Sequence, residues 1–176
     1  MVKRLKIVGV MGSGAERHDA LALPLGALLA QMGVDLLTGG GGGVMEAVAE
    51  GFVRVENRVG RSIGVLPGRV VDAGCEAPAG YPNRFVEIVI RTHLPGRGKE
   101  SGSALSRNAI NIASVDAVVV LPGGDGTASE ALLARQLGKA ALGLGGGGQG
   151  EGISQAETLD EVQAFLRSAL GLEGGE

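Results

Sequence analysis

The chain has 176 residues, enough for one domain with a hydrophobic core but too few for two domains of ordinary size. Hydrophobic residues make up 44% and aromatic residues only 2%, so we expect a core of aliphatic side chains, typical of a parallel sheet covered on both faces. The net charge of −3 disfavours nonspecific binding to nucleic acids or anionic membranes, and the shortage of aromatics disfavours base stacking. We therefore predict no nucleic-acid partner and no membrane association.

Cysteine content and the N-terminal segment both bear on location. Cys75 is the only cysteine, which excludes an intrachain disulfide and favours a reducing compartment. Lys3-Arg4 leads straight into a short apolar run, without the longer apolar stretch of a signal peptide, and no segment approaches membrane-spanning length. We predict a cytoplasmic protein with one domain over residues 1–176 and a frayed tail at 171–176.

The first half of the sequence alternates strand and helix patterns. Aliphatic runs predict strands at 5–11, 34–37 and 62–66, and periodic apolar residues predict helices at 19–31 and from 44 onward. Pro24 is unfavourable beyond the first turn of a helix, which leaves a later start of the first helix open. This βαβα order predicts an α/β fold: a three-layer, Rossmann-like, doubly wound and mostly parallel sheet.

The second half continues this alternation, with two irregular stretches. The capping-box pair Thr158 and Glu161 marks the start of the last helix. The remaining predictions are a surface loop at 69–82, a strand at 85–90, a mobile basic loop at 92–102, a helix at 103–114, a strand at 118–121, a helix ending near 137, a strand at 140–144, a glycine loop at 145–148 and the last helix ending near 170.

The stretch from Val118 to Glu130 is the strongest functional signal. A β-branched run ends at Pro122, three glycines follow within four positions, and an alanine- and leucine-rich helical pattern begins. Backbone N–H groups at such a turn, together with the positive end of the helix dipole, can hold a phosphate, and Thr127 can add a hydroxyl. Glu130 lies one helical turn further on, so we expect its carboxylate to reach the same pocket.

Two further glycine turns follow predicted strands, at 12–14 and 39–43. Because the carboxyl ends of parallel strands share one edge of the sheet, we expect all three turns to meet there, although plain strand-to-helix turns are the alternative. The sequence has neither a Walker lysine nor a Gly-x-Gly-x-x-Gly fingerprint, which disfavours ATP hydrolysis and NAD binding. The candidate phosphate- or nucleotide-binding residues are Gly12, Ser13, Gly39, Gly40, Gly41, Gly123, Gly124, Gly126 and Thr127.

Three motifs, in this order, resemble the lonely-guy superfamily, often labelled "possible lysine decarboxylase". They are Thr38-Gly-Gly-Gly-Gly-Gly-Val-Met-Glu-Ala-Val-Ala49, Ile63-Gly-Val-Leu-Pro67 and Pro122-Gly-Gly-Asp-Gly-Thr-Ala-Ser-Glu130, and the likeness covers roughly residues 5 to 145. The resemblance implies a Rossmann-like fold and a homodimer, or a larger assembly of dimers, with pockets near the subunit interface. Its best-known members are phosphoribohydrolases, which cleave nucleoside 5′-monophosphates into base and ribose 5-phosphate.

The resemblance also implies a catalytic pair, Arg107 and Glu130. A carboxylate can stabilise an oxocarbenium-like sugar, and an arginine can hold phosphate and orient the substrate. The sequence departs from the hydrolases around the arginine, where Ala104-Leu105-Ser106-Arg107-Asn108 replaces a Met-His pair and a following lysine, and at Asp125, whose charge disfavours a nearby phosphate. This form resembles a smaller branch related to molybdenum-cofactor carrier proteins, which bind a phosphorylated pterin without turning it over.

The favoured hypothesis is a nucleoside monophosphate phosphoribohydrolase, because both members of the Arg107–Glu130 pair are present, and the alternative is a non-catalytic carrier or sensor of a phosphorylated ligand. Neither requires a cofactor, although a nucleoside monophosphate, phosphate or molybdopterin-type ligand can be bound. His18 and His93 have no companions at ligand spacing, so we predict no metal site, and Cys75 lacks an obvious base. Lys139 fits a helix-end charge better than a pyridoxal phosphate lysine, and Arg97 and Lys99 either guide an anion or are merely solvated.

Overall fold

The structure, a computed structural model, describes residues 4–72, 74–94 and 106–172. The strands in these residues are β1 Ile7–Met11, β2 Asp35–Thr38, β3 Ser62–Leu66, β4 Arg69–Val71, β5 Gly74–Glu76, β6 Ile88–Arg91, β7 Ala117–Val120, β8 Ala140–Leu144 and β9 Ser154–Ala156. The helices are α1 Asp19–Gln31, α2 Val44–Val53, α3 Arg107–Ser114, α4 Asp125–Gln136 and α5 Leu159–Leu170.

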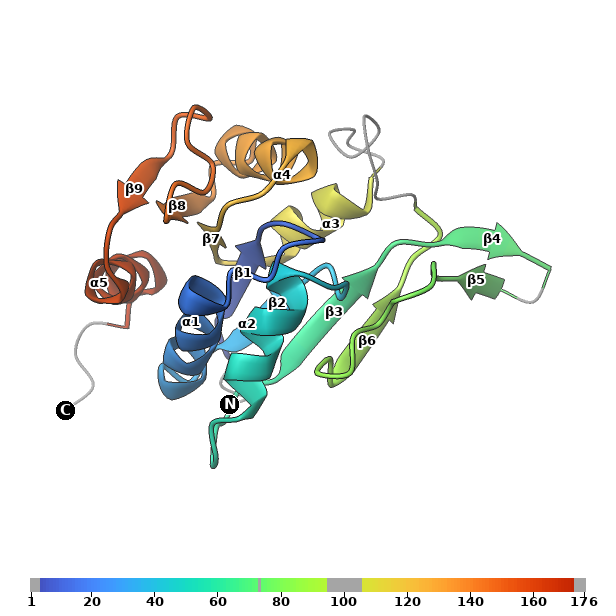
Figure 1. The fold of residues 1–176 in the computed structure, drawn as a ribbon, viewed down its shortest axis with the longest axis horizontal. Coiled ribbons are helices and arrows are strands. Elements are labelled where there is room, and N and C mark those ends of the chain that lie inside the picture. The colour runs from blue at the N-terminus through green and yellow to red at the C-terminus, as the bar shows by residue number, and fades with distance from the viewer. Residues whose placement is uncertain (1–3, 73, 95–105, 173–176) are drawn as a thin grey trace.

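Seven of the described strands form one sheet in the order β6-β3-β2-β1-β7-β8-β9 (Figure 1). Every neighbouring pair in this sheet is parallel. The chain proceeds outward from β1 in one direction through β2, β3 and β6, and in the other direction through β7, β8 and β9. The doubly wound α/β fold expected from the sequence is confirmed, with β1 and β7 on the two sides of the switch point.

The helices cover the sheet on both faces and so make three layers (Figure 1). Along β7, Ala117 and Val119 point into the core shared with α1, α2 and α5, whereas Val118 and Val120 point into the core shared with α3 and α4. This alternation follows from the two-residue period of a strand, and it explains why a strand buried on both faces is aliphatic at every position.

The helices α1 and α2 pack closely through two glycines. A methyl group on Gly26 of α1 would overlap the backbone carbonyl of Val48, and one on Gly51 of α2 would overlap that of Leu23. Pro24 lies inside α1, which is continuous from Asp19, so a later start of this helix is wrong. Pro24 has no N–H, so the carbonyl of Ala20 loses its helical hydrogen bond. Both residues are exposed, so this carbonyl can bond water instead and the proline is tolerated.

Two predicted boundaries differ from the structure for local reasons. The segment 69–82, expected to be an irregular loop, contains the antiparallel pair β4 and β5, which projects from the body of the molecule (Figure 1). Five of its six strand residues are exposed, so no apolar alternation marks it. The strand expected at 85–90 begins only at Ile88, because Asn83 accepts hydrogen bonds from the N–H groups of Phe85 and Val86.

Two other differences concern the second half. The short strand β9 was not predicted, because Ser154 and Gln155 are polar and exposed at the edge of the sheet. The helix expected from residue 103 is described from Arg107, with Ser106 as its N-cap, and residues 103–105 lie outside the described ranges. The last helix has the predicted capping box and ends at Leu170, and residues 173–176 of the predicted frayed tail are also outside these ranges.

Candidate functional site

A cavity of about 460 Å³ lies at the carboxyl ends of β1 and β7, where the strand order reverses. Ligands bind at this position in open α/β sheets. The cavity is lined by Val10, Met11, Gly12, Ser13, Gly14, Ala15, Gly39, Met45, Tyr81, Arg107, Asn108, Gly124, Gly126, Thr127 and Glu130. The three glycine turns expected from the sequence to share one edge of the sheet each contribute to this lining.

Ser13 joins the three glycine turns to one another. Its N–H donates to the carbonyl of Pro122 at 3.0 Å, and its own carbonyl accepts from the N–H of Val44 at 2.8 Å. The Ser13 hydroxyl accepts from the N–H groups of Ala15 and Glu16, which closes the turn after β1. These hydrogen bonds connect the backbones of the segments after β1, β2 and β7, which all contribute to the lining of the cavity.

Three candidate glycines leave room for neighbouring side chains. Gly39 lines the cavity, and a methyl group there would overlap Nη1 of Arg107. A methyl group on Gly41 would overlap the ring of Tyr81, and one on Gly123 would overlap Oγ1 of Thr127. Gly40, Gly41 and Gly123 are not among the described lining residues, and the missing side chains of Gly41 and Gly123 let Tyr81 and Thr127 approach the loop backbone.

The helix α4 begins at the cavity. Gly124 is its N-cap, and the first turn contains Asp125, Gly126 and the buried Thr127. The N–H groups of a first helical turn lack carbonyl partners within the helix, and the helix dipole adds partial positive charge. Asp125 is exposed and is not among the described lining residues.

Arg107 and Glu130 reach the cavity from different helices, α3 and α4. Both are buried, at 4% and 8% exposure. Burial raises the pKa of the Glu130 carboxyl to about 7, while the Arg107 guanidinium and the Asn111 amide act in the opposite direction. The arginine can hold a phosphate, and a carboxyl with a pKa near 7 can exchange a proton with a ligand near neutral pH.

Sequence reasoning missed Asn108, Tyr81 and Met45 as lining residues. Oδ1 of Asn108 is buried and accepts no hydrogen bond within the described part of the chain, which leaves an acceptor beside the cavity. The available signals were weak: Asn108 follows Arg107 directly, and Tyr81 is the single tyrosine of the sequence. Which face of α3 is buried could not be read from so short a helix.

The sequence matches the SLOG cluster4 family over residues 5–169. The chain belongs to the SLOG cluster4 family. It is 33% identical over 168 residues to an uncharacterised protein of Archaeoglobus fulgidus, covering 94% of this chain and 97% of that protein.

Two solved structures are similar to this SLOG cluster4 protein over almost its whole length. The molybdenum cofactor binding protein of Rippkaea orientalis is 31% identical, with a TM-score of 0.63, covering 96% of this chain and 87% of that one. The molybdenum cofactor carrier protein of Chlamydomonas reinhardtii is 28% identical, with a TM-score of 0.70, covering 96% and 99%. The resemblance to the superfamily, and to its branch related to molybdenum-cofactor carriers, is thereby confirmed.

In this SLOG cluster4 chain the described cavity lining does not include three residues for which the sequence suggested other roles, His18, Cys75 and Lys139. His18, in a left-handed conformation, is the N-cap of α1, and Cys75 is exposed on β5. Within the described ranges no group of three or more His, Cys, Asp or Glu side chains is placed to hold a metal ion. Lys139 donates to the carbonyls of Ala113 and Val115 at the end of α3.

Two other predictions concern the basic loop and the membrane. Arg97 and Lys99 lie outside the described residues, so the structure does not bear on their predicted role. In the part of the chain that the structure describes, no helix has both the length and the apolar character needed to cross a bilayer.

Proposed function

We propose that this chain binds a small phosphorylated ligand of the molybdenum-cofactor type, a pterin that carries a phosphate, and holds it without chemical change. The likeness to proteins described as binding or carrying the molybdenum cofactor supports this, because it extends over almost the whole chain. A nucleoside monophosphate combines the same two chemical parts, a flat heterocycle and a phosphate, so it is the nearest alternative ligand.

The observation that carries the proposal is the meeting of the α4 N-terminus with Arg107 in one cavity. Backbone N–H groups of Gly124 and Gly126 can surround a phosphate, and the Thr127 hydroxyl can donate a further bond. Arg107 adds a full positive charge in a buried setting, where its attraction for an anion is screened less than at the surface. The buried acceptor of Asn108 suits a donor group on the ligand.

Binding without turnover is favoured by the carboxyl content of the cavity. Hydrolysis of a glycosidic bond commonly uses two carboxyl groups, one beside the developing positive charge of the sugar and one that transfers a proton. Glu130 is the single carboxyl group among the described lining residues, so a second carboxyl group is lacking there.

The second candidate is a phosphoribohydrolase, and the pairing of Arg107 with Glu130 in the cavity favours it. In that reaction Glu130 would order the ribose hydroxyls and stabilise the sugar, while Arg107 would hold the phosphate. The sequence Ser106-Arg107-Asn108 lacks the lysine that follows the arginine in those enzymes.

Thermal and calorimetric titration with inorganic phosphate, AMP, GMP and a 6-alkylpterin monophosphate tests the proposal. A ligand at a hundred times its Kd should stabilise the fold by about 2.7 kcal/mol. Arg107→Gln should abolish this effect, whereas Arg167→Gln, which removes an exposed arginine on α5, should leave it intact. Unchanged melting with every one of these compounds would overturn the proposal.

Chromatography of the same mixtures distinguishes the two candidate functions. A carrier returns GMP and AMP intact after long incubation. Release of free base by the wild-type chain, and its loss in Glu130→Gln, would instead establish the hydrolase and overturn binding without turnover.

A further inference from the structure

A second hollow of about 530 Å³ adjoins the cavity and shares Gly14 and Tyr81 with it. It is lined by Gly14, Gly42, Glu46, Ala79, Gly80, Tyr81, Pro82, Asn83 and Arg84, which come from the glycine loops, α2 and the segment before β6. We call it the outer pocket and the cavity with Arg107 the inner pocket. Because they share two lining residues, one extended ligand can occupy both.

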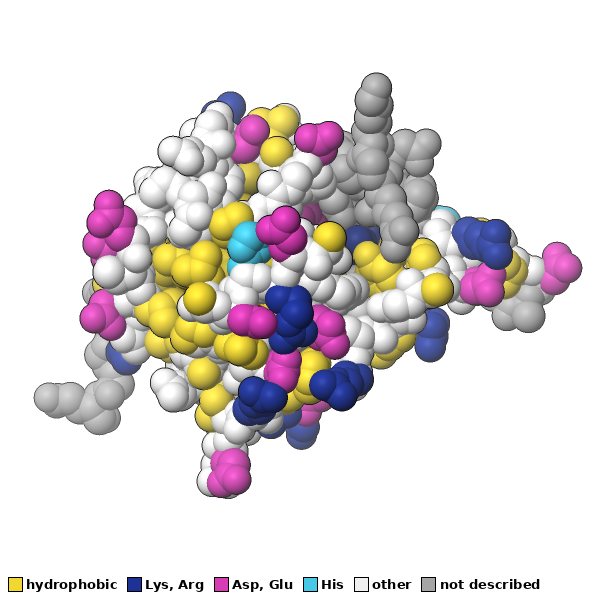
Figure 2. Space-filling model, viewed as in Figure 1, with side chains coloured by type: hydrophobic (Ala, Val, Ile, Leu, Met, Phe, Trp, Pro, Cys, Tyr) yellow, Lys and Arg dark blue, Asp and Glu magenta, His cyan; other side chains and the backbone are white. Residues whose placement is uncertain are grey.

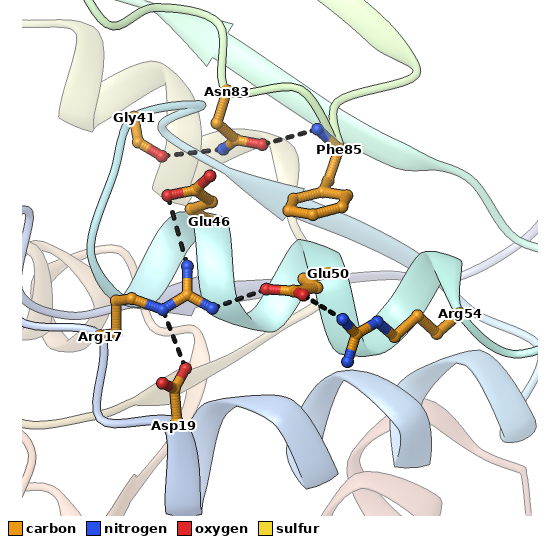
Figure 3. Close-up of polar contacts among 8 residues, drawn as sticks. All are labelled: Arg17, Asp19, Gly41, Glu46, Glu50, Arg54, Asn83 and Phe85. Atoms are coloured by element: carbon orange, nitrogen blue, oxygen red, sulfur yellow. Dashed lines mark hydrogen bonds and ion pairs between the residues drawn. The ribbon is translucent and has the colours of Figure 1, made fainter.

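Tyr81 separates the two pockets and is held firmly. Its ring lies directly over Gly41, where any side chain would overlap it. Asn83 holds the same segment against the glycine loop: its side-chain N–H donates to the carbonyl of Gly41 at 2.8 Å (Figure 3). Its backbone N–H donates to the carbonyl of Gly40 at 2.8 Å. A fixed aromatic ring at the junction offers a flat heterocycle a face to stack on.

Glu46 supplies the carboxylate of the outer pocket, and Arg17 orients it. Nη1 of Arg17 lies 3.3 Å from Oε2 of Glu46, while the same guanidinium also contacts Glu50 at 2.6 Å and Asp19 at 3.0 Å (Figure 3). The other oxygen of Glu46 points away from Arg17, toward the side of Asn83. Arg54 also belongs to this network, where it pairs with Glu50 and not with Glu46.

The network lies on the surface over α2, where positive and negative side chains gather (Figure 2). Glu46 is 31% exposed, so a ligand can reach it from the outer pocket without displacing Arg17. Ala79, Gly80 and Pro82 give the outer pocket apolar or small walls, and Asn83 and Arg84 add an amide and a guanidinium, the latter lying over the ring of Phe85. A flat ring with N–H donors along one edge matches these features, because the carboxylate accepts from the donors while the walls contact the faces.

We propose that the outer pocket binds the 2-amino-4-oxopyrimidine ring that pterins and guanine share. Glu46 accepts from the exocyclic amino group and the adjacent ring N–H, Tyr81 stacks on the ring, and the phosphate lies in the inner pocket near Arg107. Adenine is disfavoured because the corresponding edge presents an acceptor nitrogen, which a carboxylate repels. This inference rests on the proposed function and names the ligand class of the same site.

Calorimetric titration of wild type with AMP, GMP and a 6-alkylpterin monophosphate tests this. The expected result is that the latter two bind about tenfold more tightly than AMP. Glu46→Gln should remove that preference and change the affinity for AMP little. Tyr81→Ala should weaken binding of all three heterocyclic ligands but not of inorganic phosphate. Tyr81→Phe should retain binding of all of them. Asp19→Asn, which changes the same network outside the pocket, should preserve the preference. Comparing GMP with the pterin separates the two ring systems.

The outcomes separate this inference from the proposed function. Two results would overturn the assignment of the outer pocket: equal affinity of wild type for AMP and GMP, or equal losses of affinity for all ligands in a Glu46→Gln variant whose melting temperature is unchanged. In either case the proposed binding that depends on Arg107 would still stand. Absence of binding by every compound overturns both.

Discussion

Nη1 of Arg107 occupies the space that a methyl group on Gly39 would need. Arg107 comes from α3 and Gly39 from the turn after β2, so the residue that carries the positive charge of the inner pocket is positioned by a glycine distant in sequence. This contact makes Gly39 a positioning residue for the guanidinium, and it can be tested without changing the arginine itself.

We expect Gly39→Ala to displace the Arg107 guanidinium and to weaken binding of inorganic phosphate by about tenfold, the loss of one charge-assisted hydrogen bond. Gly42→Ala is the matched control in the same loop, because a methyl group there meets its nearest neighbour, the carbonyl of Gly14, at 3.5 Å. Calorimetry with phosphate measures both variants. Equal affinities in Gly39→Ala and Gly42→Ala would contradict the positioning role.

Glu130 should make stability depend on pH. Its pKa is raised from 4.5 to about 7 on folding, so between these values the folded chain binds more protons than the unfolded chain. Stability from this group is therefore full below pH 4.5 and decreases as the pH rises toward 7, by an amount on the order of 3 kcal/mol. Glu130→Gln should be more stable than wild type at pH 8, with the difference vanishing at pH 4.5.

Urea unfolding at pH 5 and pH 8 measures this effect. Glu16→Gln removes an exposed carboxyl and controls for the loss of one charge. If Glu130→Gln and wild type lose stability equally between the two pH values, the raised pKa of Glu130 is wrong.

Two glycine-to-alanine changes should have opposite effects on stability. Gly26→Ala brings a methyl group into the carbonyl of Val48 between α1 and α2, and we expect a loss of about 1–3 kcal/mol. Gly126→Ala lies in α4 with open space around it, and alanine should stabilise the helix by about 0.5 kcal/mol or more. Denaturant titration of the unliganded variants measures both effects. A Gly26→Ala variant as stable as wild type, or more stable, would contradict the close packing of α1 on α2.

The strand β6 is the place where we expect a second copy of the chain to associate. Ile88, Val89 and Ile90 are 44%, 37% and 43% exposed on β6, an end strand whose one partner among the described strands is β3. Exposed apolar residues on an unpaired edge favour association. The homodimer implied by the family resemblance therefore stays a prediction with a defined surface.

Val89→Lys should shift the chain toward monomer in analytical ultracentrifugation. Val59→Lys, at a valine that is 67% exposed outside the sheet, is the matched control and should leave association unchanged. A monomeric wild type, or a dimer unaffected by Val89→Lys, would exclude this surface.

The sequence alone was sufficient for the α/β class and for most of the elements. Ser62–Leu66 and Ala140–Leu144 are strands with the predicted bounds, because continuous aliphatic runs between turn residues have few other solutions. It failed for β4, β5 and β9, which are short, exposed and held by pairing with a neighbour rather than by their own pattern.

The same division holds for the site. Glycines at strand ends and the Thr127–Glu130 spacing indicated a phosphate pocket, since backbone conformation and helix polarity are local properties. Tertiary structure alone placed Arg107 against Gly39, set Tyr81 over Gly41 and oriented Glu46 through Arg17. These contacts join segments far apart in the chain, and the burial that raises the pKa of Glu130 is likewise a property of the packed molecule. The sequence by itself therefore determines the local features, which are the glycine turns and the helix N-terminus that can hold a phosphate. The shape of the pocket and the ionisation of Glu130 are decided only when distant segments pack together.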